Sequence, residues 1–579
     1  MQLAVGNLDL AIIVAYLAGV VGLGCYAGFV RRRGGGEGSH YFLAGNTLTW
    51  PVIGLSMFAA NISTVHLVSL AEAAYKYGLV FGNFEWMAGF TLILLSLFFA
   101  PLYLRSRVPT LPDFLERRFN RQCRDLLSIV SLFSAIVIHI GIALYTAAWV
   151  LRGILGMPLD ATILGIDGLM FFIIALGVLT GVYTMVGGLL AVVWTESIQT
   201  VLLLLGAVVI TAAAWIKIGG WTELSLTLAT HAHPLAGTAN DIPQQTGNFL
   251  SMARGPSDLS GLPWYSILLG YPVLGIWYWC ADQTIVQRVL AARDETQARL
   301  GPLFCAFIKI FPVFLFVLPG TIAVALVQRN AFGGEAPAAA ADTYTFLITR
   351  LLPAGLKGLV TAAMLAAAMQ TCSAALNSTA TLFAYDIFKR WRPTTKDHKL
   401  VFIGKITTVV ATVLAILWSP LLSHYSTIYD GLARLISYIS PPITAVFLLG
   451  VFSKKASARG AYITLLSGSA LGAMMFGLDF FGKPLGNWLA ATGLSTAKAG
   501  LDWVALYVVK DFMLTAFWLF LICCAILVTS SRRFPEPLRP EAAELVWTHW
   551  QEPLRSSGSY RVISAGVAAT LVVLYFWFW

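Results

Sequence analysis

The chain has 579 residues, of which 58% are hydrophobic and 11% are charged, and its formal net charge is +10. Soluble globular proteins carry about 25% charged residues, so this composition excludes a soluble fold and indicates a protein integral to a lipid bilayer. The Lys and Arg residues lie in short segments beside apolar runs, which is typical of a topology signal and excludes the basic surface of a nucleic-acid-binding protein.

Apolar runs of about 20 residues, the length that crosses a bilayer, recur about fourteen times along the chain. We therefore expect an all-α integral membrane protein that forms a single transmembrane domain over residues 1–579. The first run lacks a basic start and a small-residue cleavage site, so it is interpreted as a retained helix rather than a signal peptide. The predicted spans are 8–30, 48–73, 81–107, 123–156, 163–187, 190–216, 263–290, 299–328, 357–388, 399–424, 428–452, 458–480, 505–531 and 559–579.

The basic segments predict the orientation of the chain in a plasma (inner) membrane. If the N-terminus lies outside, Arg31–Arg33, Arg105–Arg124 and Lys389–Lys399 all fall inside, as the positive-inside rule requires. An even number of spans then places the C-terminus outside as well. The lipid bilayer is an expected partner, whereas no pattern in the sequence indicates a nucleic acid, a protein partner or a nucleotide-binding motif.

Two of the predicted spans carry interruptions. Asn61 and Ser63 interrupt the second span, and Pro272, Gly275 and Asp282 interrupt the seventh. Proline removes a backbone donor and glycine permits unwinding, so both spans are predicted to be broken helices. Broken helices five spans apart favour an inverted repeat with a transporter's binding site between the copies, and two ordinary kinked helices are the alternative. The resulting division is repeat one at about 48–216, repeat two at about 263–452, and peripheral helices at 8–30, 458–480, 505–531 and 559–579.

Opposite charges fall at membrane depth on two different helices. Glu85 lies in the third span and Lys309 in the eighth, and charge at this depth is expensive and usually functional. A hydroxyl-rich ligand can donate to the carboxylate and accept from the ammonium. The aromatic run Trp277–Trp279 at the break of the seventh span suits the apolar face of a sugar ring, although such runs more often serve packing.

Other ionisable residues at this depth have a structural alternative. Asp282 has Arg288 nearby in the sequence, and Asp430 and Arg434 have the spacing of an ion pair within one helix. His139 in the fourth span and Glu196 in the sixth complete the set of ionisable residues at membrane depth.

The ninth span is unusually polar for a transmembrane helix. From its middle onward it contains Gln370, Thr371, Ser373, Asn377 and Ser378. Polar groups at bilayer depth usually line an ion or substrate pathway. The alternative is that small hydroxyl residues let neighbouring helices pack closely.

Five sequence motifs occur in order: AANIS at 59–63, FEWMAG at 84–89, YTMVGGLLAVVWTESIQ at 183–199, WYWCADQTIVQR at 277–288 and ALNSTATLFAYDIF at 375–388. Together they resemble the solute:sodium symporter family, and within it the sodium/glucose cotransporter branch. The resemblance covers residues from about 8 to the C-terminus. It implies a fourteen-helix fold with a five-plus-five inverted repeat that works by alternating access.

The resemblance also implies a sodium site at the first broken helix. The implied ligands are the backbone carbonyls of Ala59, Ile62 and Ala367 and the hydroxyl of Thr371. The family normally has a second serine before Thr371, where this chain has Gln370. Its amide oxygen would replace the hydroxyl, or its side chain would crosslink to the broken helix and make the ion unnecessary. Glu196 stands where the family usually has an aspartate on the inner exit path of the ion.

A sugar site is implied by the same resemblance. Its residues would be Asn61, His66, Glu85, Tyr278, Trp279 and Lys309. Tyr278 resembles the inner gate that stacks on the sugar ring. Two positions depart from the pattern: the eleventh span has Ala433 where a sugar-binding glutamine is expected, and the fourth has His139 at a variable position.

These features predict a secondary active symporter that moves a sugar or related polyhydroxylated solute together with sodium. A sodium-independent or proton-linked sugar carrier of the same fold is the first alternative, with His66, His139 or Glu196 as proton candidates. A membrane-embedded enzyme would need catalytic residues grouped on one aqueous face, whereas the candidate residues here lie mid-membrane on different helices. A transporter-like sensor is a third alternative, and the chain shows no signalling module.

Overall fold

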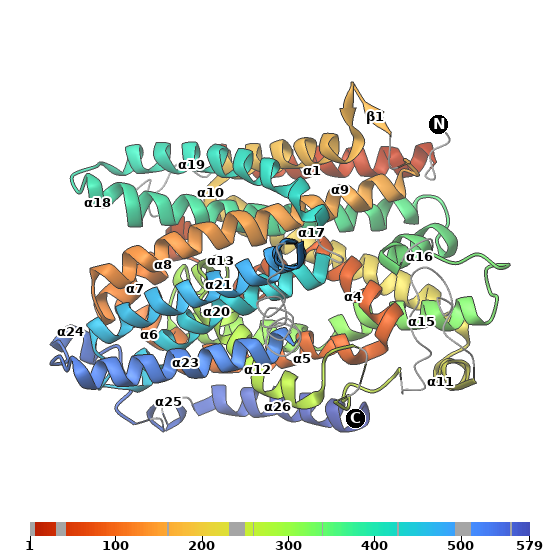
Figure 1. Cartoon of the computed structure of the whole chain (residues 1–579). Coiled ribbons are helices and arrows are strands. Elements are labelled where there is room, and N and C mark those ends of the chain that lie inside the picture. Colours follow the sequence, from red (N-terminus) through yellow and green to blue (C-terminus); the bar gives the residue numbers. More distant parts are fainter. Residues whose placement is uncertain are drawn as a thin grey trace.

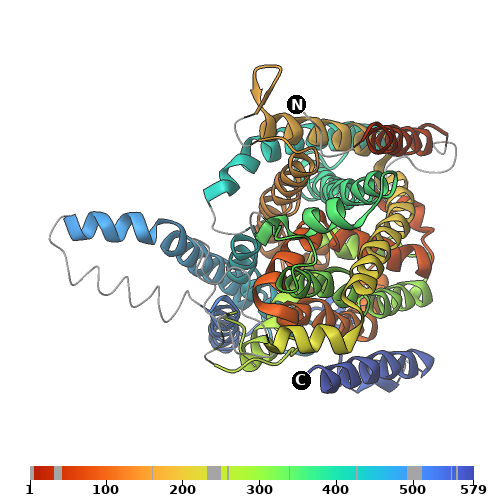
Figure 2. The ribbon, with the colours of Figure 1, turned by 90° about the vertical axis from the view of Figure 1, so that its right-hand side faces the viewer.

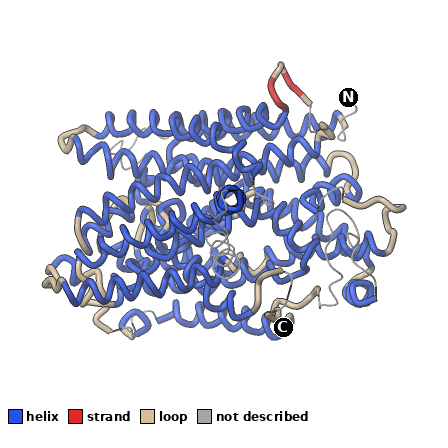
Figure 3. The backbone as a smooth tube through the Cα atoms, in the orientation of Figure 1, coloured by secondary structure: helices blue, strands red, loops and turns tan. Residues whose placement is uncertain are grey.

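The computed structural model describes residues 6–30, 42–158, 161–230, 249–256, 258, 260–337, 340–424, 428–491, 511–549, 551–555 and 558–579. These residues form a helical bundle whose long helices lie side by side, roughly horizontal in Figure 1. Figure 2 turns the bundle and shows the first helix and the last helix on opposite sides of it. Figure 3 shows a small hairpin as the strand structure of the described residues, formed by β1 (Thr162–Ile163) and β2 (Ile166–Asp167).

The α-helices of the first half are α1 (Asn7–Val30), α3 (Trp50–Asn61), α4 (Thr64–Tyr77), α5 (Asn83–Leu94), α6 (Ala100–Ser106), α7 (Leu111–Arg118), α8 (Arg121–Ser134), α9 (Ile142–Ile154), α10 (Gly168–Ile218), α11 (Trp221–Thr230), α12 (Trp264–Ile276) and α13 (Gln283–Leu290). Those of the second half are α14 (Glu295–Ile308), α15 (Leu318–Gln328), α16 (Thr343–Leu351), α17 (Leu356–Leu382), α18 (Lys389–Trp391), α19 (Asp397–Trp418), α20 (Ile428–Phe452), α21 (Ala458–Ala491), α23 (Phe512–Arg533), α24 (Pro540–Ala543), α25 (Glu552–Arg555) and α26 (Gly558–Trp577).

Short segments of altered helical pitch join several of these helices. The π-helical segments are η3 (Leu95–Phe99), η4 (Ala135–Gly141), η5 (Trp277–Ala281), η6 (Val313–Val317) and η8 (Phe383–Phe388). The 3-10 segments are η1 (Ala44–Asn46), η2 (Gly78–Gly82), η7 (Ala340–Asp342) and η9 (Ser419–His424). Single π turns inside α-helices occur frequently at functional sites.

Eleven helical stretches of the described residues are long and apolar enough to cross a membrane, so the chain is a multi-pass membrane protein. Eleven of the fourteen predicted spans correspond to these stretches. The three predicted spans without a corresponding stretch are 8–30, 48–73 and 263–290. The first has a shorter apolar helix at Asn7–Leu23, and the other two are divided by backbone breaks. The count of fourteen stays a prediction.

Both predicted broken helices are confirmed. The helical backbone of α3 ends at Asn61, where Ile62 and Ser63 adopt extended conformations, and α4 then begins at Thr64. In the second case α12 continues through η5 to Ala281, and extended backbone at Asp282 separates it from α13. The break therefore lies ten residues beyond Pro272, which sits inside α12. The proline marks the interrupted helix but not the residue at which the helix ends.

The predicted spans 163–187 and 190–216 form one continuous helical element, α10, of 51 residues. A straight helix of this length would be about 77 Å long, far more than a hydrocarbon core of about 30 Å. Two separate stretches within α10 are apolar enough to span, Gly168–Val186 and Ile198–Ile218. In Figure 1 the first part (gold) runs beside α1 and the last part (yellow) lies lower in the bundle.

The two ends of the bundle differ in which short helices and chain termini lie there. In Figure 1 both chain termini lie toward the right-hand end of the long helices, whereas α7, α18 and α24 lie at the left-hand end. Residues Thr343–Leu351 form the short helix α16 at the right.

Candidate functional site

A cavity is lined by residues of the break between α3 and α4 and by residues of the segment η5. Its empty volume is about 930 Å³, including the open space at its mouth. All six residues of the predicted sugar site line it: Asn61, His66, Glu85, Tyr278, Trp279 and Lys309. The break of α3 and α4, the first turn of α5, the segment η5 and the end of α14 supply these six side chains.

The strongest polar contact in the cavity wall joins Lys309 to Glu85. Lys309 Nζ lies 2.5 Å from Glu85 Oε2, and each side chain is only 2% exposed. Glu85 sits in the first turn of α5 and Lys309 follows the last residue of α14, so each charge is at the helix end whose dipole favours it. The ammonium also lies 5.4 Å from the centroid of the Trp279 ring, a cation–π distance. The charges predicted on separate helices are thus brought together.

His66 is held in one orientation by the helix that it begins. Its Nδ1 accepts a hydrogen bond from the Ser63 backbone N–H at 3.3 Å and lies 3.2 Å from the Ser63 hydroxyl oxygen. Together these contacts form a capping box at the N-terminus of α4. Because Nδ1 accepts, the neutral ring carries its proton on Nε2. The His66 ring therefore presents a donor nitrogen in the cavity wall.

His139 also lines the cavity, from the segment η4. Its Nε2 is 3.5 Å from Asp282 Oδ2, and its ring centroid is 5.8 Å from that of Tyr278. Asp282 already uses its other carboxylate oxygen to accept from the Thr284 backbone N–H and cap α13. Among the described residues, His139 Nε2 makes no hydrogen bond.

Asn61 is a second cavity residue with an unused polar atom. Its Oδ1 is buried and has no hydrogen-bond partner among the described residues. Buried polar atoms in native proteins are nearly always paired, so two unpaired atoms in one cavity wall indicate groups that a ligand or water satisfies. Asn61 and His139 are therefore candidate contacts for a ligand or a water molecule in this cavity.

Thr371 connects the cavity to the predicted sodium site. It lines the cavity, and its Oγ1 lies 3.5 Å from the carbonyl oxygen of Ala60 and 3.4 Å from that of Ala367. Ala59 and Ile62, the two other predicted contributors of carbonyls, are fully buried beside this point at the end of α3. The structure adds the carbonyl of Ala60, which the sequence motif did not single out.

The side chain of Gln370 contacts the long helix α10. Its Nε2 lies 3.4 Å from the backbone oxygen of Glu196 in α10, and its Oε1 is buried without a partner among the described residues. The observed crosslink therefore joins α17 to α10 rather than to α3.

Glu196 forms a fully buried ion pair with Arg288. Its Oε1 lies 2.9 Å from Arg288 Nη2, and its Oε2 accepts from the Ser56 hydroxyl. Arg288 Nε also donates to the Ser56 oxygen at 3.0 Å. The expected pairing of Asp282 with Arg288 is therefore wrong, since the side chain of Asp282 caps α13 and faces His139.

Arg434 lies outside the cavity lining, and its Nη1 is 3.1 Å from Asp479 Oδ1 of α21. The sequence also suggests a pairing of Arg434 with Asp430, but the side chain of Asp430 lies outside the described residues. Ala433, the neighbour of Arg434 in α20, does line the cavity with its small apolar side chain. The helix α20 thus contributes apolar side chains to the cavity lining, namely Leu432, Ala433 and Ile436.

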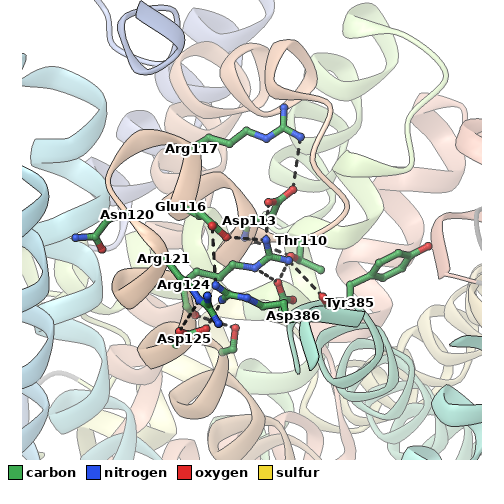
Figure 4. Close-up of polar contacts among 12 residues, drawn as sticks. Thr110, Asp113, Glu116, Arg117, Asn120, Arg121, Arg124, Asp125, Tyr385 and Asp386 are labelled. Atoms are coloured by element: carbon green, nitrogen blue, oxygen red, sulfur yellow. Dashed lines mark hydrogen bonds and ion pairs between the residues drawn. The ribbon is translucent and has the colours of Figure 1, made fainter. Parts of the chain in front are cut away.

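A second polar cluster lies away from the cavity, where α7 and α8 meet η8 (Figure 4). Arg124 Nε donates to Asp386 Oδ1 at 2.6 Å, and its Nη1 lies 2.8 Å from both Asp113 Oδ1 and Glu116 Oε2. Thr110 donates its hydroxyl to Asp386 at 3.0 Å. None of these five residues lines the cavity. The cluster ties the α7–α8 segment to the end of the α17 helix.

Comparison with known proteins gives the family. The model of the sodium:solute symporter family matches residues 41–468. The chain belongs to this family. It is 33% identical to sodium/glucose cotransporter 2 of Rattus norvegicus over 495 residues, which covers 82% of this chain and 72% of that one. It is 34% identical to the sodium/glucose cotransporter of Vibrio parahaemolyticus over 472 residues, which covers 79% and 83%.

Two further similarities cover nearly the whole chain. The sodium/mannose cotransporter SLC5A10 of Bos taurus is 32% identical over 557 residues, covering 93% of this chain and 89% of that one. The solved structure of a Na⁺-coupled sialic acid symporter superposes with a TM-score of 0.73 at 22% identity, covering 92% and 99%. The symporter family membership makes this protein a solute transporter rather than an enzyme, with sodium as the coupling ion.

Proposed function

We propose that this symporter moves a sugar or a related polyhydroxylated solute together with sodium, by alternating access around the central cavity. The Glu85–Lys309 pair carries the proposal. A hydroxyl group can donate to the carboxylate while another accepts from the ammonium, so a polyol satisfies both charges at once. Tyr278 and Trp279 supply aromatic faces beside the pair, which suit the apolar face of a sugar ring.

The named substrates of relatives support this class of solute. Proteins called sodium/glucose, sodium/mannose and sodium/myo-inositol cotransporters are 31–34% identical to this chain. The three solutes share a six-membered ring with several hydroxyl groups. We therefore propose that the substrate is a monosaccharide or a cyclitol.

Substrate preference would depend on His139 more than on α20. Ala433 offers no amide to a sugar hydroxyl, whereas His139 Nε2 and Asn61 Oδ1 lie in the cavity wall without partners. A substrate hydroxyl that bridges His139 Nε2 and Asp282 Oδ2, which lie 3.5 Å apart, would satisfy the histidine. Unpaired polar groups of this kind discriminate strongly between substrates, because a solute that lacks the matching hydroxyl leaves them unsatisfied.

Sodium would bind at the junction of α3 and α17, held by Thr371 and the backbone carbonyls around it. For a hard cation, oxygen ligands at about 2.4 Å place neighbouring ligands roughly 3.4 Å apart. The separations of 3.4 and 3.5 Å from Thr371 Oγ1 to the Ala367 and Ala60 oxygens fit this spacing. They are long for direct hydrogen bonds. Ala59 and Ile62 would complete the set of carbonyls, and Gln370 Oε1 would remain available as a further oxygen.

Coupling would follow from the residues that the two ligands share. Asn61 ends α3 and Thr371 lies in α17, and both line the cavity. An ion that draws the carbonyls of the α3 break toward Thr371 also fixes Asn61 and, through Ser63, the His66 ring. The sugar would then bind more tightly, because the residues of the cavity wall are already ordered. The bound sugar would in turn hold the ion site closed.

We propose that the transport cycle uses the transmembrane topology that the sequence predicts. Fourteen spans with a five-plus-five inverted repeat, and both termini outside, would place α7, α18 and α24 on the inside. The cluster around Arg124 would then stabilise the inner end of the bundle, and Glu196 would lie on the inner exit path. The ion pair with Arg288 would be weakened when sodium passes Glu196.

Uptake into sealed proteoliposomes tests this function. Radiolabelled glucose, mannose and myo-inositol would be offered with an inward sodium gradient or with an equal potassium gradient at fixed membrane potential. Concentrative uptake of at least one solute only with sodium supports the proposal. Equal uptake under both gradients would replace it with a sodium-independent carrier, and no uptake of any polyol would reject the substrate class. Proteoliposomes that contain the Glu85→Gln variant are the matched control.

A further inference from the structure

A second hollow lies at the end of the bundle where α9, α16 and the start of α17 meet. Its lining includes the basic residues Arg152, Arg350 and Lys357, together with Trp149 and Asp342. In Figure 1 α9 and α16 lie toward the right-hand end of the bundle, on the same side as both chain termini. It shares no lining residue with the central cavity.

Arg152 is the unusual residue of this hollow. The residue is 8% exposed, and its guanidinium carbon lies 4.3 Å from the centroid of the Trp149 ring. Among the described residues no carboxylate lies within ion-pair distance of Arg152, and its Nε has no hydrogen-bond partner. A buried guanidinium without a counter-charge is strongly unfavourable unless a ligand supplies one.

The other charges of the hollow leave an excess of positive charge. Arg350 pairs with Glu335, which neutralises it. Lys357 has no ion pair with any described residue and is only partly exposed. Asp342 is the acidic residue in the lining, so Arg152 and Lys357 together exceed it by one positive charge.

We propose that this hollow binds a small oxyanion, a carboxylate or phosphate group, between Arg152 and Lys357. A planar guanidinium offers two parallel N–H donors to such a group, and a lysine ammonium adds a point charge. The stacking on Trp149 holds the guanidinium plane in place for this contact. The group belongs either to a free anion or to the headgroup of an anionic lipid.

The position of Arg152 links this site to the transport cavity. Ile142 and Ala143 in the first turn of α9 line the central cavity, whereas Arg152 lies in its last turn. The two ends are about 15 Å apart along one helix. An anion that immobilises the last turn of α9 therefore acts on an element that the transported solute also touches.

Titration of the purified full-length protein in neutral detergent tests the proposal. Inorganic phosphate, sulfate and acetate are added at constant ionic strength, and binding is followed by the thermal unfolding temperature and by tryptophan fluorescence. We expect saturable binding that weakens at least tenfold in Arg152→Gln and in Lys357→Gln. The exposed Arg293→Gln variant is the matched control and should bind as the wild type does.

The lipid arm uses nanodiscs of phosphatidylcholine with or without phosphatidylglycerol. Stabilisation by phosphatidylglycerol alone, lost in Lys357→Gln, would assign the site to a lipid headgroup. Stabilisation by free phosphate in detergent would assign it to a free anion. Absence of both effects, or effects of equal size in wild type and Lys357→Gln, would overturn the proposal even if Arg152→Gln fails to fold.

Discussion

Lys309 Nζ and Glu85 Oε2 lie 2.5 Å apart across the wall of the central cavity, one at the C-terminal end of α14 and the other in the first turn of α5. The contact joins residues 224 positions apart in the sequence. A buried ion pair is weak evidence for stability, because desolvation offsets much of its attraction. Its position in a cavity beside Tyr278 and Trp279 instead favours a role in binding.

The buried pair of Glu196 and Arg288 gives a prediction for stability. Arg288→Met leaves the fully buried carboxyl group of Glu196 without its counter-charge, and we expect it to lower the free energy of unfolding by about 3–5 kcal/mol. The double variant Glu196→Met, Arg288→Met removes both charges and should recover most of this loss. Thermal unfolding in detergent measures the stability of the single and the double variant, with the exposed Arg293→Met variant as control. A double variant as unstable as the single variant would contradict this account.

Sodium dependence should respond to the two adjacent residues of α17. Thr371→Ala removes the hydroxyl between the Ala60 and Ala367 carbonyls, and we expect at least a tenfold rise in the sodium concentration for half-maximal uptake, about 1.4 kcal/mol. Gln370→Ser restores a second hydroxyl and should lower that concentration. The control is Ser373→Ala, because the Ser373 hydroxyl donates to its own helix. An uptake rate that is flat against sodium in wild type and rises only in Gln370→Ser would show that this chain has lost sodium coupling.

Substrate preference should change at two positions of the cavity lining. His139→Phe keeps a ring against Tyr278 but removes Nε2, so the Kd for the preferred solute should rise about tenfold, or ~1.4 kcal/mol. Ala433→Gln adds an amide on α20 and should strengthen glucose binding. Equilibrium binding of a panel of sugars, cyclitols and uronates measures both effects. An unchanged order of preference in both variants would remove these positions from the specificity model, and a strong uronate preference would direct attention to Arg434.

The cluster around Arg124 gives a prediction for pH dependence. Burial raises the pKa of the Asp113 carboxyl above its ordinary value of 3.8, although Arg124 and Arg117 act in the opposite direction. The folded state therefore keeps this proton to a higher pH than the unfolded chain, so the ionisation of Asp113 lowers stability as pH rises above the unfolded pKa. Asp113→Asn has no such ionisation. The stability of the variant relative to wild type should therefore increase with pH over this window.

Thermal unfolding of wild type and Asp113→Asn across a pH series measures that difference. Asp125→Asn is the control, because Asp125 lies on the same helix α8 as Arg124 and its side chain is 47% exposed. A difference between Asp113→Asn and wild type that falls with rising pH would contradict the assigned direction.

The sequence predicts the broken helices because breaks have local causes. Asn61, Ser63 and Asp282 compete for backbone hydrogen bonds, and each lies at or beside the observed break. Sequence proximity does not, however, predict the ion-pair partner of Arg288. The nearest carboxylate in sequence, Asp282, caps α13, whereas Glu196 meets Arg288 from 92 residues away. Partners that depend on tertiary packing carry no local signal.

Two other features of the site could not be predicted from single residues. The π-helical segments η4 and η5 carry His139 and Tyr278 and bring their rings within 5.8 Å. Such segments follow from packing against other helices, and no composition marks them. The carbonyl of Ala60 likewise faces Thr371 because of the backbone break, and its side chain gives no hint of it.

Equilibrium sugar binding at several sodium concentrations tests the central claim most directly. Purified wild type, Glu85→Gln, Lys309→Ala and the charge-free double variant Glu85→Gln, Lys309→Met would be compared, with thermal unfolding as the check on folding. We predict that sodium tightens sugar binding in wild type, that sugar tightens sodium binding by the same factor, and that the folded variants bind no sugar. Folded variants that bind and transport sugar as wild type does, or sugar binding that is independent of sodium, would contradict this account.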